Sequence, residues 1–170
     1  MSILPMKFLF LVRHAKSSWN DAAMADFDRP LNARGIRDAA EMGRRLLVRV
    51  SNIDAFVCSP AQRARTTAEK FSETFGKDKN EIVFEKGLYL APESFFNQLI
   101  CKFDNHLHSV ALFSHNPGIT YFANTLTTAI QTDNIPTSGI FAVKALTDNW
   151  EHFLTAEKEF LFYDYPKRER

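Results

Sequence analysis

The chain has 170 residues, a formal net charge of +1, 45% hydrophobic residues and 13% aromatic residues. This length and composition predict a single folded domain over residues 1–170, with a core of about 7–165. A net charge close to zero argues against nucleic acid or an anionic membrane as a partner held by bulk charge. The basic residues that matter for function must therefore act locally.

The cysteine count and the terminal sequence bear on the compartment. Cys58 and Cys101 are too few for a disulfide framework or a usual zinc site, which favours a reducing setting. Residues 1–7 lack the charged and then apolar order of a signal peptide. No apolar run approaches the roughly 18 residues that a membrane-spanning helix needs. We therefore expect a cytoplasmic protein without a membrane partner.

The first expected element is a buried strand. An apolar run over 8–12 leads directly into Arg13 and His14, two residues that do not belong in a core. In an open α/β sheet, such a strand delivers the next residues to its carboxyl edge, where ligands bind. Arg13 and His14 are therefore candidates for a site. A helix-capping role, or a hydrogen-bonded core histidine, is the alternative.

Helices and strands then alternate along the chain. Asn32 is a typical N-cap before a helix whose apolar positions include Ile36 and Leu47. Such alternation predicts an α/β fold, a three-layer α-β-α sandwich around a mostly parallel but mixed sheet of about six strands. From residue 82 onward, we expect a strand over 82–84, a helix over 93–103, a strand over 110–113, a helix over about 119–130, and strands over 140–146 and about 158–163.

A second group of polar residues follows a strand expected over 53–57. Ser59 and Pro60 are typical of an N-cap and of a first helical position, so we expect a helix to begin there. Arg63 then lies in the first helical turn, close to the sheet edge. A cation in that turn opposes the helix dipole unless an anion is bound. The alternative, an exposed basic helix end, suits Arg65 better.

A third polar group, from Ser114 to Gly118, follows the strand over 110–113. His115 at a strand end has a ring N–H that can donate to a phosphoryl oxygen, and backbone N–H groups of the next helix add to it. The alternative is an ordinary strand-to-helix turn, which the Asn-Pro-Gly sequence serves equally well. If the strands are parallel, all three polar groups share one edge of the sheet.

Together these segments resemble the histidine phosphatase superfamily. Segment 11–20 is similar to its Arg-His-Gly signature, with Ala15 in place of the glycine, and segments 28–35, 59–67 and 114–117 resemble the signatures that follow in order. Segment 88–91 and the short length resemble the SixA-like phosphohistidine phosphatase branch. The resemblance implies a phosphoglycerate-mutase-like fold and a role in signal transduction.

The resemblance also implies roles for individual residues. His14 would be the nucleophile that is phosphorylated on a ring nitrogen, and the other catalytic groups would surround the phosphoryl group. Phosphoryl transfer needs mainly positioning and charge stabilisation, which arginine and histidine supply, so we expect no metal and no cofactor. The catalytic set is His14, Arg13, Arg63 and His115, and the candidate phosphate-binding residues are Asn20, Ser17 and Asn116.

The residues at the positions of a general acid indicate the substrate class. One branch of the superfamily has an Asp after the second histidine, where this chain has Asn116, and another has a Glu close to the position of Leu90. Glu85 and Glu93 remain as candidate acids. Without a general acid, the reaction of a substrate with an alkoxide leaving group is slower by about 10²–10⁴-fold. A substrate with an imidazole leaving group loses less, because imidazole leaves far more easily. We therefore expect a phosphohistidine substrate.

The spacing of the motifs agrees with a protein substrate. Only 52 positions separate Arg63 from His115, which leaves little room for a lid that encloses small molecules. A histidine-phosphorylated protein is thus the expected partner. The alternative enzyme is a small-molecule phosphomonoesterase or a phosphoglycerate-mutase-like transferase. A phosphoanion-binding module is the non-enzyme alternative, disfavoured because the full catalytic set is present.

Three further features have two interpretations each. Asp26, Asp28 and Arg29 belong either to the rim of the site or only to a turn. Trp19 either flanks the entrance or packs against the domain, and packing is the favoured interpretation. His106 and His108 form either a metal pair or part of a polar loop, and two ligands without a third favour the loop.

Overall fold

A computed structural model describes residues 5–168 and contains one six-stranded sheet in the order β3-β2-β4-β1-β5-β6. The strands are β1 (Lys7–Arg13), β2 (Ala55–Cys58), β3 (Val83–Phe84), β4 (Ser109–Ser114), β5 (Ile140–Ala145) and β6 (Lys158–Asp164). The α-helices are α1 (Ala33–Arg49), α2 (Gln62–Thr74), α3 (Glu93–Ile100) and α4 (Gly118–Leu126), and the 3-10 helices are η1 (Asp26–Asp28), η2 (Lys79–Glu81), η3 (Lys86–Leu88) and η4 (Trp150–His152).

The sheet is mixed. Strands β1 to β4 pair in parallel, whereas β5 pairs antiparallel with both β1 and β6. Within residues 5–168, no helix is long and apolar enough to cross a membrane. The expected α/β architecture with a mixed sheet of six strands is confirmed.

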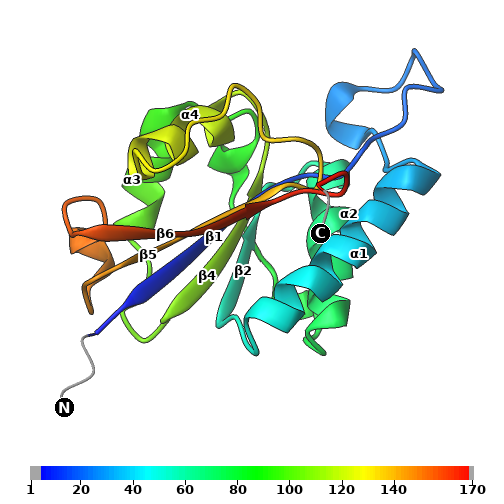
Figure 1. Cartoon of the computed structure of the whole chain (residues 1–170). Coiled ribbons are helices and arrows are strands. Elements are labelled where there is room, and N and C mark those ends of the chain that lie inside the picture. Colours follow the sequence, from blue (N-terminus) through cyan, green and yellow to red (C-terminus); the bar gives the residue numbers. More distant parts are fainter. Residues whose placement is uncertain (1–4, 169–170) are drawn as a thin grey trace.

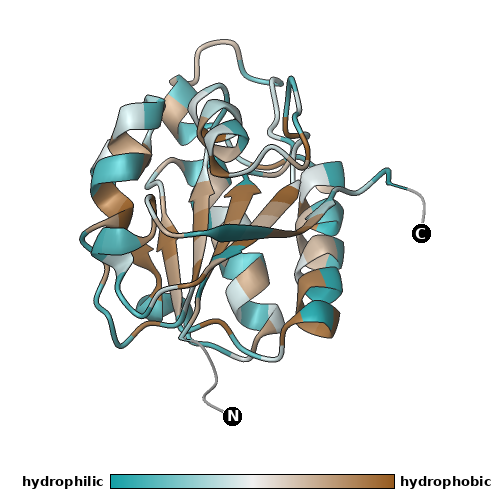
Figure 2. Ribbon diagram, turned by 60° about the vertical axis from the view of Figure 1, so that its left-hand side comes forward, coloured by the Kyte–Doolittle hydropathy of each residue, from teal (hydrophilic) through white to brown (hydrophobic). Residues whose placement is uncertain are grey.

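Helices cover both faces of the sheet, which creates two apolar layers (Figure 1). Leu9 and Leu11 of β1 pack with α3 and α4 on one face. Phe10 and Val12 point to the other face and pack with α1 and α2. Figure 2 shows the interior strands in hydrophobic colours and hydrophilic residues on the outer sides of the helices. Because β1 is buried on both faces, its side chains from Phe8 to Val12 are all apolar, whichever face they point to.

The start of α2 differs from the expectation. The helix begins at Gln62 with Ala61 as the N-cap, so the prediction that Ser59 caps it is wrong. The reason is that Ser59 is used elsewhere: its backbone N–H donates to the carbonyl of Phe113, at 3.0 Å, and continues the strand pairing. Its hydroxyl lies against His115. The expected N-cap of α1 is confirmed, because the Asn32 side chain accepts a hydrogen bond from Gly35 N.

The inward face of α1 is narrower than the apolar pattern indicated. Ile36 and Leu47, which the apolar pattern places on the same helical face as the buried residues, are 43% and 37% exposed. Ala39, Met42 and Leu46 form the buried stripe that faces α2 and the sheet. Helix α3 also ends at Ile100, three residues before the expected end.

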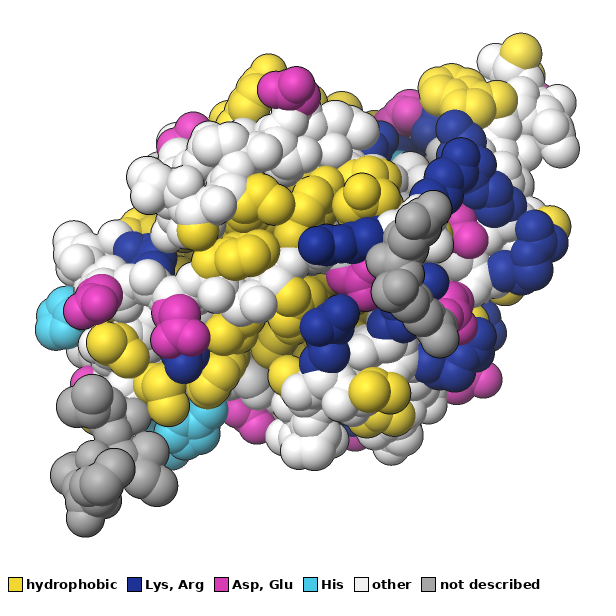
Figure 3. Space-filling model, in the orientation of Figure 1, with side chains coloured by type: hydrophobic (Ala, Val, Ile, Leu, Met, Phe, Trp, Pro, Cys, Tyr) yellow, Lys and Arg dark blue, Asp and Glu magenta, His cyan; other side chains and the backbone are white. Residues whose placement is uncertain are grey.

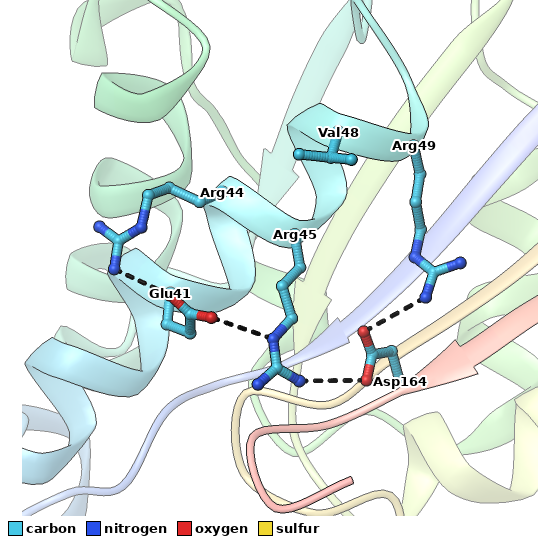
Figure 4. A pocket seen from close by; sticks show the side chains of 6 residues that line it. All are labelled: Glu41, Arg44, Arg45, Val48, Arg49 and Asp164. Carbon is cyan, nitrogen blue, oxygen red and sulfur yellow. Dashed lines mark hydrogen bonds and ion pairs between the residues drawn. The ribbon is translucent and has the colours of Figure 1, made fainter. Parts of the chain in front are cut away.

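Basic side chains concentrate on the side of the molecule that carries α1 and the C-terminal segment (Figure 3). A hollow of about 470 Å³ lies there between α1 and β6, lined by Arg44, Arg45, Arg49 and two acids. Figure 4 shows that these acids, Glu41 and Asp164, bridge the arginines. None of the candidate site residues lines this hollow, and its ion pairs tie the helix to the edge of the sheet.

Candidate active site

The strand register brings the first and third motifs together. Arg13, the last residue of β1, is paired with Ser114, the last residue of β4. The next residues, His14 and His115, therefore emerge side by side at the carboxyl edge of the sheet. Their ring centroids are 5.0 Å apart. Strand β2 ends beside β4 at Cys58, which brings the segment that leads into α2 to the same edge.

His14 is held as a neutral imidazole. Its Nδ1 lies 2.8 Å from the carbonyl oxygen of Ala15, which only accepts, so the ring proton is on Nδ1 and the lone pair is on Nε2. Burial lowers the pKa of His14 to about 3, and the charges of Arg63, Arg13 and Arg29 add to that effect against the Ala15 hydrogen bond. An imidazole that is neutral at pH 7 can attack phosphorus through Nε2.

Arg63 approaches that lone pair from the first turn of α2. It is buried, and its Nε donates to Nε2 of His14 at 3.3 Å. The rest of its guanidinium points outward, where Nη1 donates to the backbone carbonyl of Asp26 at 2.6 Å and Nη2 to the Asp26 carboxylate at 3.0 Å. Arg63 lies in the first turn of α2, as the sequence predicts. Arg63 thus links the nucleophile to the mouth of the site.

His115 is fixed by the end of the β2 segment. Its Nε2 lies 2.7 Å from the Ser59 hydroxyl, and its Nδ1 is buried and makes no hydrogen bond within the protein. Burial lowers the pKa of His115 well below its ordinary value, and His14 and Arg63 lower it further. With the Ser59 hydroxyl as donor, Nδ1 carries the ring proton and is available as a donor to an anion.

Arg13 is anchored by a loop that precedes β5. Its Nη1 donates to Asn134 Oδ1 at 3.1 Å and to the carbonyl of Ile135 at 2.7 Å. Its Nε is buried and makes no hydrogen bond within the protein. A guanidinium fixed at one end, with a free N–H at the other, suits an anion held beside it.

Arg29 belongs to the site as well, which decides between its two interpretations. Only 6% exposed, it donates from Nη2 to Ser17 Oγ at 2.6 Å. The ring of Trp19 covers its guanidinium at 3.5 Å. Trp19 itself is 72% exposed, so the prediction that it packs into the domain is wrong. The signal for Arg29 was present in segment 28–35, but only the fold of loop 18–30 brings the guanidinium to the site.

Unpartnered buried donors gather around His14. Apart from the Ser138 hydroxyl, every buried side-chain N or O atom without a hydrogen bond in residues 5–168 belongs to Arg13, Arg29 or His115. Buried polar groups in proteins are nearly always hydrogen-bonded, so a local cluster of exceptions indicates a ligand site. Because arginine N–H groups carry charge and only donate, the ligand they suit is an oxyanion.

The predicted phosphate-binding residues have other hydrogen-bond partners than His14. Ser17 contacts the site through Arg29, and Asn20 is exposed, with no side-chain hydrogen bond among the described residues. Asn116 donates to Asn134 Oδ1 at 2.5 Å and accepts from Thr120 Oγ1 at 2.6 Å. It therefore holds the loop that anchors Arg13.

Among the described residues, the candidate acids Glu85 and Glu93 make no hydrogen bond to His14. Glu85 accepts from the backbone N–H of Gly87 at 2.9 Å and caps η3. Glu93 lies in the first turn of α3.

Two residues that were not predicted, Thr67 and Tyr89, do contact the site: Thr67 accepts from Ala15 N, and the Tyr89 ring lies edge-on to His115 at 5.6 Å. Thr67 was within reach of the sequence, because it shares the helical face of Arg63.

The chain matches a protein family and several relatives in sequence. The family model of the histidine phosphatase superfamily (branch 1) matches residues 9–89. An uncharacterized protein of Mycobacterium tuberculosis is 34% identical over 148 residues, which cover 82% of this chain and 89% of the relative. An uncharacterized protein of Mycobacterium leprae is 29% identical over 167 residues, 92% of this chain and 100% of the relative.

Solved structures have the same fold. A SixA structure from Nakamurella multipartita superposes with a TM-score of 0.79 at 20% identity, over 96% of this chain and 98% of that one. SixA from Agrobacterium tumefaciens gives a TM-score of 0.77 at 25% identity, over 94% and 99% of the two chains. A SixA complexed with tungstate gives 0.71 at 20% identity, over 93% and 96%. The chain therefore belongs to the histidine phosphatase superfamily and has the fold of SixA.

Proposed function

We propose that this protein is a phosphatase that removes phosphate from phosphohistidine in other proteins through a covalent phospho-His14 intermediate. The observation that carries the proposal is the cluster of buried donors without a hydrogen bond on Arg13, Arg29 and His115 around a neutral histidine. The likeness to SixA structures supports the substrate class. The substrate would be presented by a histidine-phosphorylated protein.

The reaction has two displacement steps. His14 Nε2 attacks phosphorus, its bond to phosphorus forms, and the bond between phosphorus and the substrate imidazole breaks. Water then attacks phospho-His14, which breaks the phosphorus–Nε2 bond and releases inorganic phosphate. Before the first step the phosphoryl group displaces the Arg63 Nε contact to Nε2, and Arg63 then donates to the phosphoryl oxygens. Arg13, Arg29 and His115 stabilise the charge on the same oxygens.

A substrate panel tests the proposal. We expect hydrolysis of a phosphohistidine peptide to exceed that of phosphoserine, phosphotyrosine and small phosphate esters. Replacement of the nucleophile in His14→Ala should lower kcat by about 10³-fold or more. Rapid quench should trap an acid-labile, base-stable phosphate on the wild-type protein and none on His14→Ala.

The matched control is His106→Ala, because His106 is exposed and pairs with Asp104 away from the site. It should retain wild-type activity. If the protein ignores phosphohistidine but hydrolyses a sugar phosphate or phosphoglycerate efficiently, it is a small-molecule phosphomonoesterase or mutase-like enzyme. Binding of phosphohistidine without turnover or a covalent phosphate identifies a binding module instead.

A further inference from the structure

Loop 18–30 places a carboxylate at the mouth of the site. Asp26 opens η1, and its Oδ2 accepts a hydrogen bond from Arg63 Nη2 at 3.0 Å. Its Oδ1 lies 3.5 Å from Arg29 Nε. The Asp26 side chain is 45% exposed, so it faces both the solvent and the two arginines. A carboxylate is thus one guanidinium away from the nucleophilic nitrogen of His14.

Tyr89 fixes this carboxylate from the opposite side. The Tyr89 hydroxyl donates to Asp26 Oδ2 at 2.7 Å, and its ring lies edge-on to the rings of Phe27 and His115, at 5.1 and 5.6 Å. Burial acts to raise the pKa of Asp26, but the hydrogen bonds from Tyr89 and Arg63 and the two arginine charges outweigh it and hold the pKa below its ordinary value. The carboxylate is therefore ionised at neutral pH.

An ionised carboxylate beside a phosphoanion site selects among leaving groups. A substrate with a second anionic group near its phosphate, such as phosphoglycerate, meets a like charge at the mouth, which weakens its binding. A leaving group with an N–H or a positive charge meets an acceptor instead. The phosphorylated imidazole of phosphohistidine has such an N–H when its second ring nitrogen is protonated.

We propose that Asp26 is a specificity-determining residue, whose carboxylate accepts a hydrogen bond from the free ring N–H of the substrate phosphohistidine and disfavours substrates with a second anion beside the phosphate. The inference rests on the proposed function and deepens it. It also accounts for a site in which Glu85 caps η3 and is not directed to the leaving group.

The proposal requires no acid at the atom that leaves. The substrate ring is bonded to phosphorus through one nitrogen and protonated on the other. As the bond from His14 Nε2 to phosphorus forms, the bond from phosphorus to the ring breaks and its electron pair stays on the departing nitrogen. The ring keeps its proton and leaves as neutral imidazole. Asp26 favours that protonated form of the bound substrate.

A role limited to holding Arg63 predicts a different result. If Asp26 only positions that guanidinium, its loss changes kcat/KM for every substrate by the same factor. If Asp26 interacts with the leaving group itself, the ratio of kcat/KM for a phosphohistidine peptide to that for 3-phosphoglycerate changes. This ratio therefore separates specificity from positioning.

The experiment compares wild type, Asp26→Asn and Asp28→Asn. The amide in Asp26→Asn keeps the shape and an acceptor for Tyr89 but removes the charge. We expect the ratio to fall by about 10- to 100-fold, the usual scale for a nearby like charge. Asp28 is an exposed acid in the same short helix, with no side-chain hydrogen bond among the described residues. Asp28→Asn should leave the ratio unchanged, and thermal melting of all three proteins should coincide.

The outcomes separate the two proposals. Wild-type turnover of phosphohistidine together with an unchanged ratio in Asp26→Asn overturns the role of Asp26 and leaves the proposed function intact. An equal change of the ratio in Asp28→Asn overturns it too, because the effect is then one of general loop charge. Absence of phosphohistidine turnover by wild type overturns both proposals.

Discussion

At the scale of single residues, the reactivity of His14 depends on the cost of burying a charge. The ring is 7% exposed and faces Arg63, Arg13 and Arg29. An imidazolium there would lose hydration and meet three positive charges, so the neutral ring is the stable form. The same arginines that would bind an anion under the proposed function thus keep the His14 imidazole unprotonated.

This burial makes stability depend on pH in a defined direction. The pKa of His14 is about 3 in the folded protein and about 6.5 in an unfolded chain, so between these values the unfolded state binds more protons. Stability is therefore full above about pH 6.5 and falls as the pH is lowered, by up to about 1.4 kcal/mol per pH unit for one such histidine. Urea unfolding at pH 7, 6 and 5 measures this loss.

The comparison is with His14→Asn, which removes one buried histidine. We expect its free energy of unfolding to change less between pH 7 and pH 5 than that of wild type, by roughly 1 kcal/mol per pH unit around pH 5.5. Carboxylates hardly titrate in this window. Equal pH dependences for the two proteins would show that His14 is not buried as a neutral ring.

At the scale of secondary structure elements, Thr67 joins the end of β1 to the start of α2. Its hydroxyl accepts from the backbone N–H of Ala15 at 2.9 Å and donates to the carbonyl of Arg63 at 2.7 Å. The residue is fully buried. One hydroxyl therefore sets the distance between the segment that carries the nucleophile and the helix that carries Arg63.

Thr67→Val should damage both stability and activity. The isosteric side chain leaves the buried Ala15 N–H without an acceptor, which costs about 1–3 kcal/mol. Displacement of the His14 segment should lower kcat by up to about 10²-fold. Urea unfolding and phosphatase kinetics measure the two effects.

Thr67→Ser is the matched control, because it keeps the hydroxyl and loses a buried methyl group at a cost of about 1 kcal/mol. It should retain most of the activity. A Val variant as active as the Ser variant would mean that the hydroxyl does not position the site.

At the scale of the whole molecule, a charge network fixes α1 to the far edge of the sheet. Arg45 donates to Glu41, to the buried Asp164, and to the backbone carbonyls of Tyr165 and Pro166. Figure 4 shows the arginine between the two acids. This side chain thus connects the helical layer, the edge strand β6 and the segment that follows it.

Arg45→Met should destabilise the fold without affecting catalysis. Among residues 5–168, it leaves the 5% exposed Asp164 with only Arg49 at 3.6 Å as an ion-pair partner, and the expected cost is about 2–4 kcal/mol. Arg44→Met is the control: the Arg44 side chain is 63% exposed and contacts Glu41, so its loss should cost less than about 1 kcal/mol. Urea unfolding of both variants checks the difference, and equal losses would contradict it.

The sequence could predict much of this architecture because its signals are local. The apolar run over 8–12 and the helical spacing that follows it indicated strands, helices and their order. Because parallel strands share an edge, that order was enough to bring Arg13, His14, Arg63 and His115 together. The start of α2 was misplaced because Ser59 contacts His115, a residue 56 positions away, and local capping preference contains no information on such a contact.

The sequence by itself thus determined the sheet, the family resemblance and four basic residues at one edge, since each depends on periodicity or on a motif. Only the tertiary structure decided how loop 18–30 folds across that edge. The loop has no periodic pattern, and its position is set by contacts of Asp26 with Arg63 and Tyr89, 37 and 63 residues later in the chain. These contacts hold the Asp26 carboxylate against Arg63 at the mouth of the candidate site, where we propose that the leaving group departs.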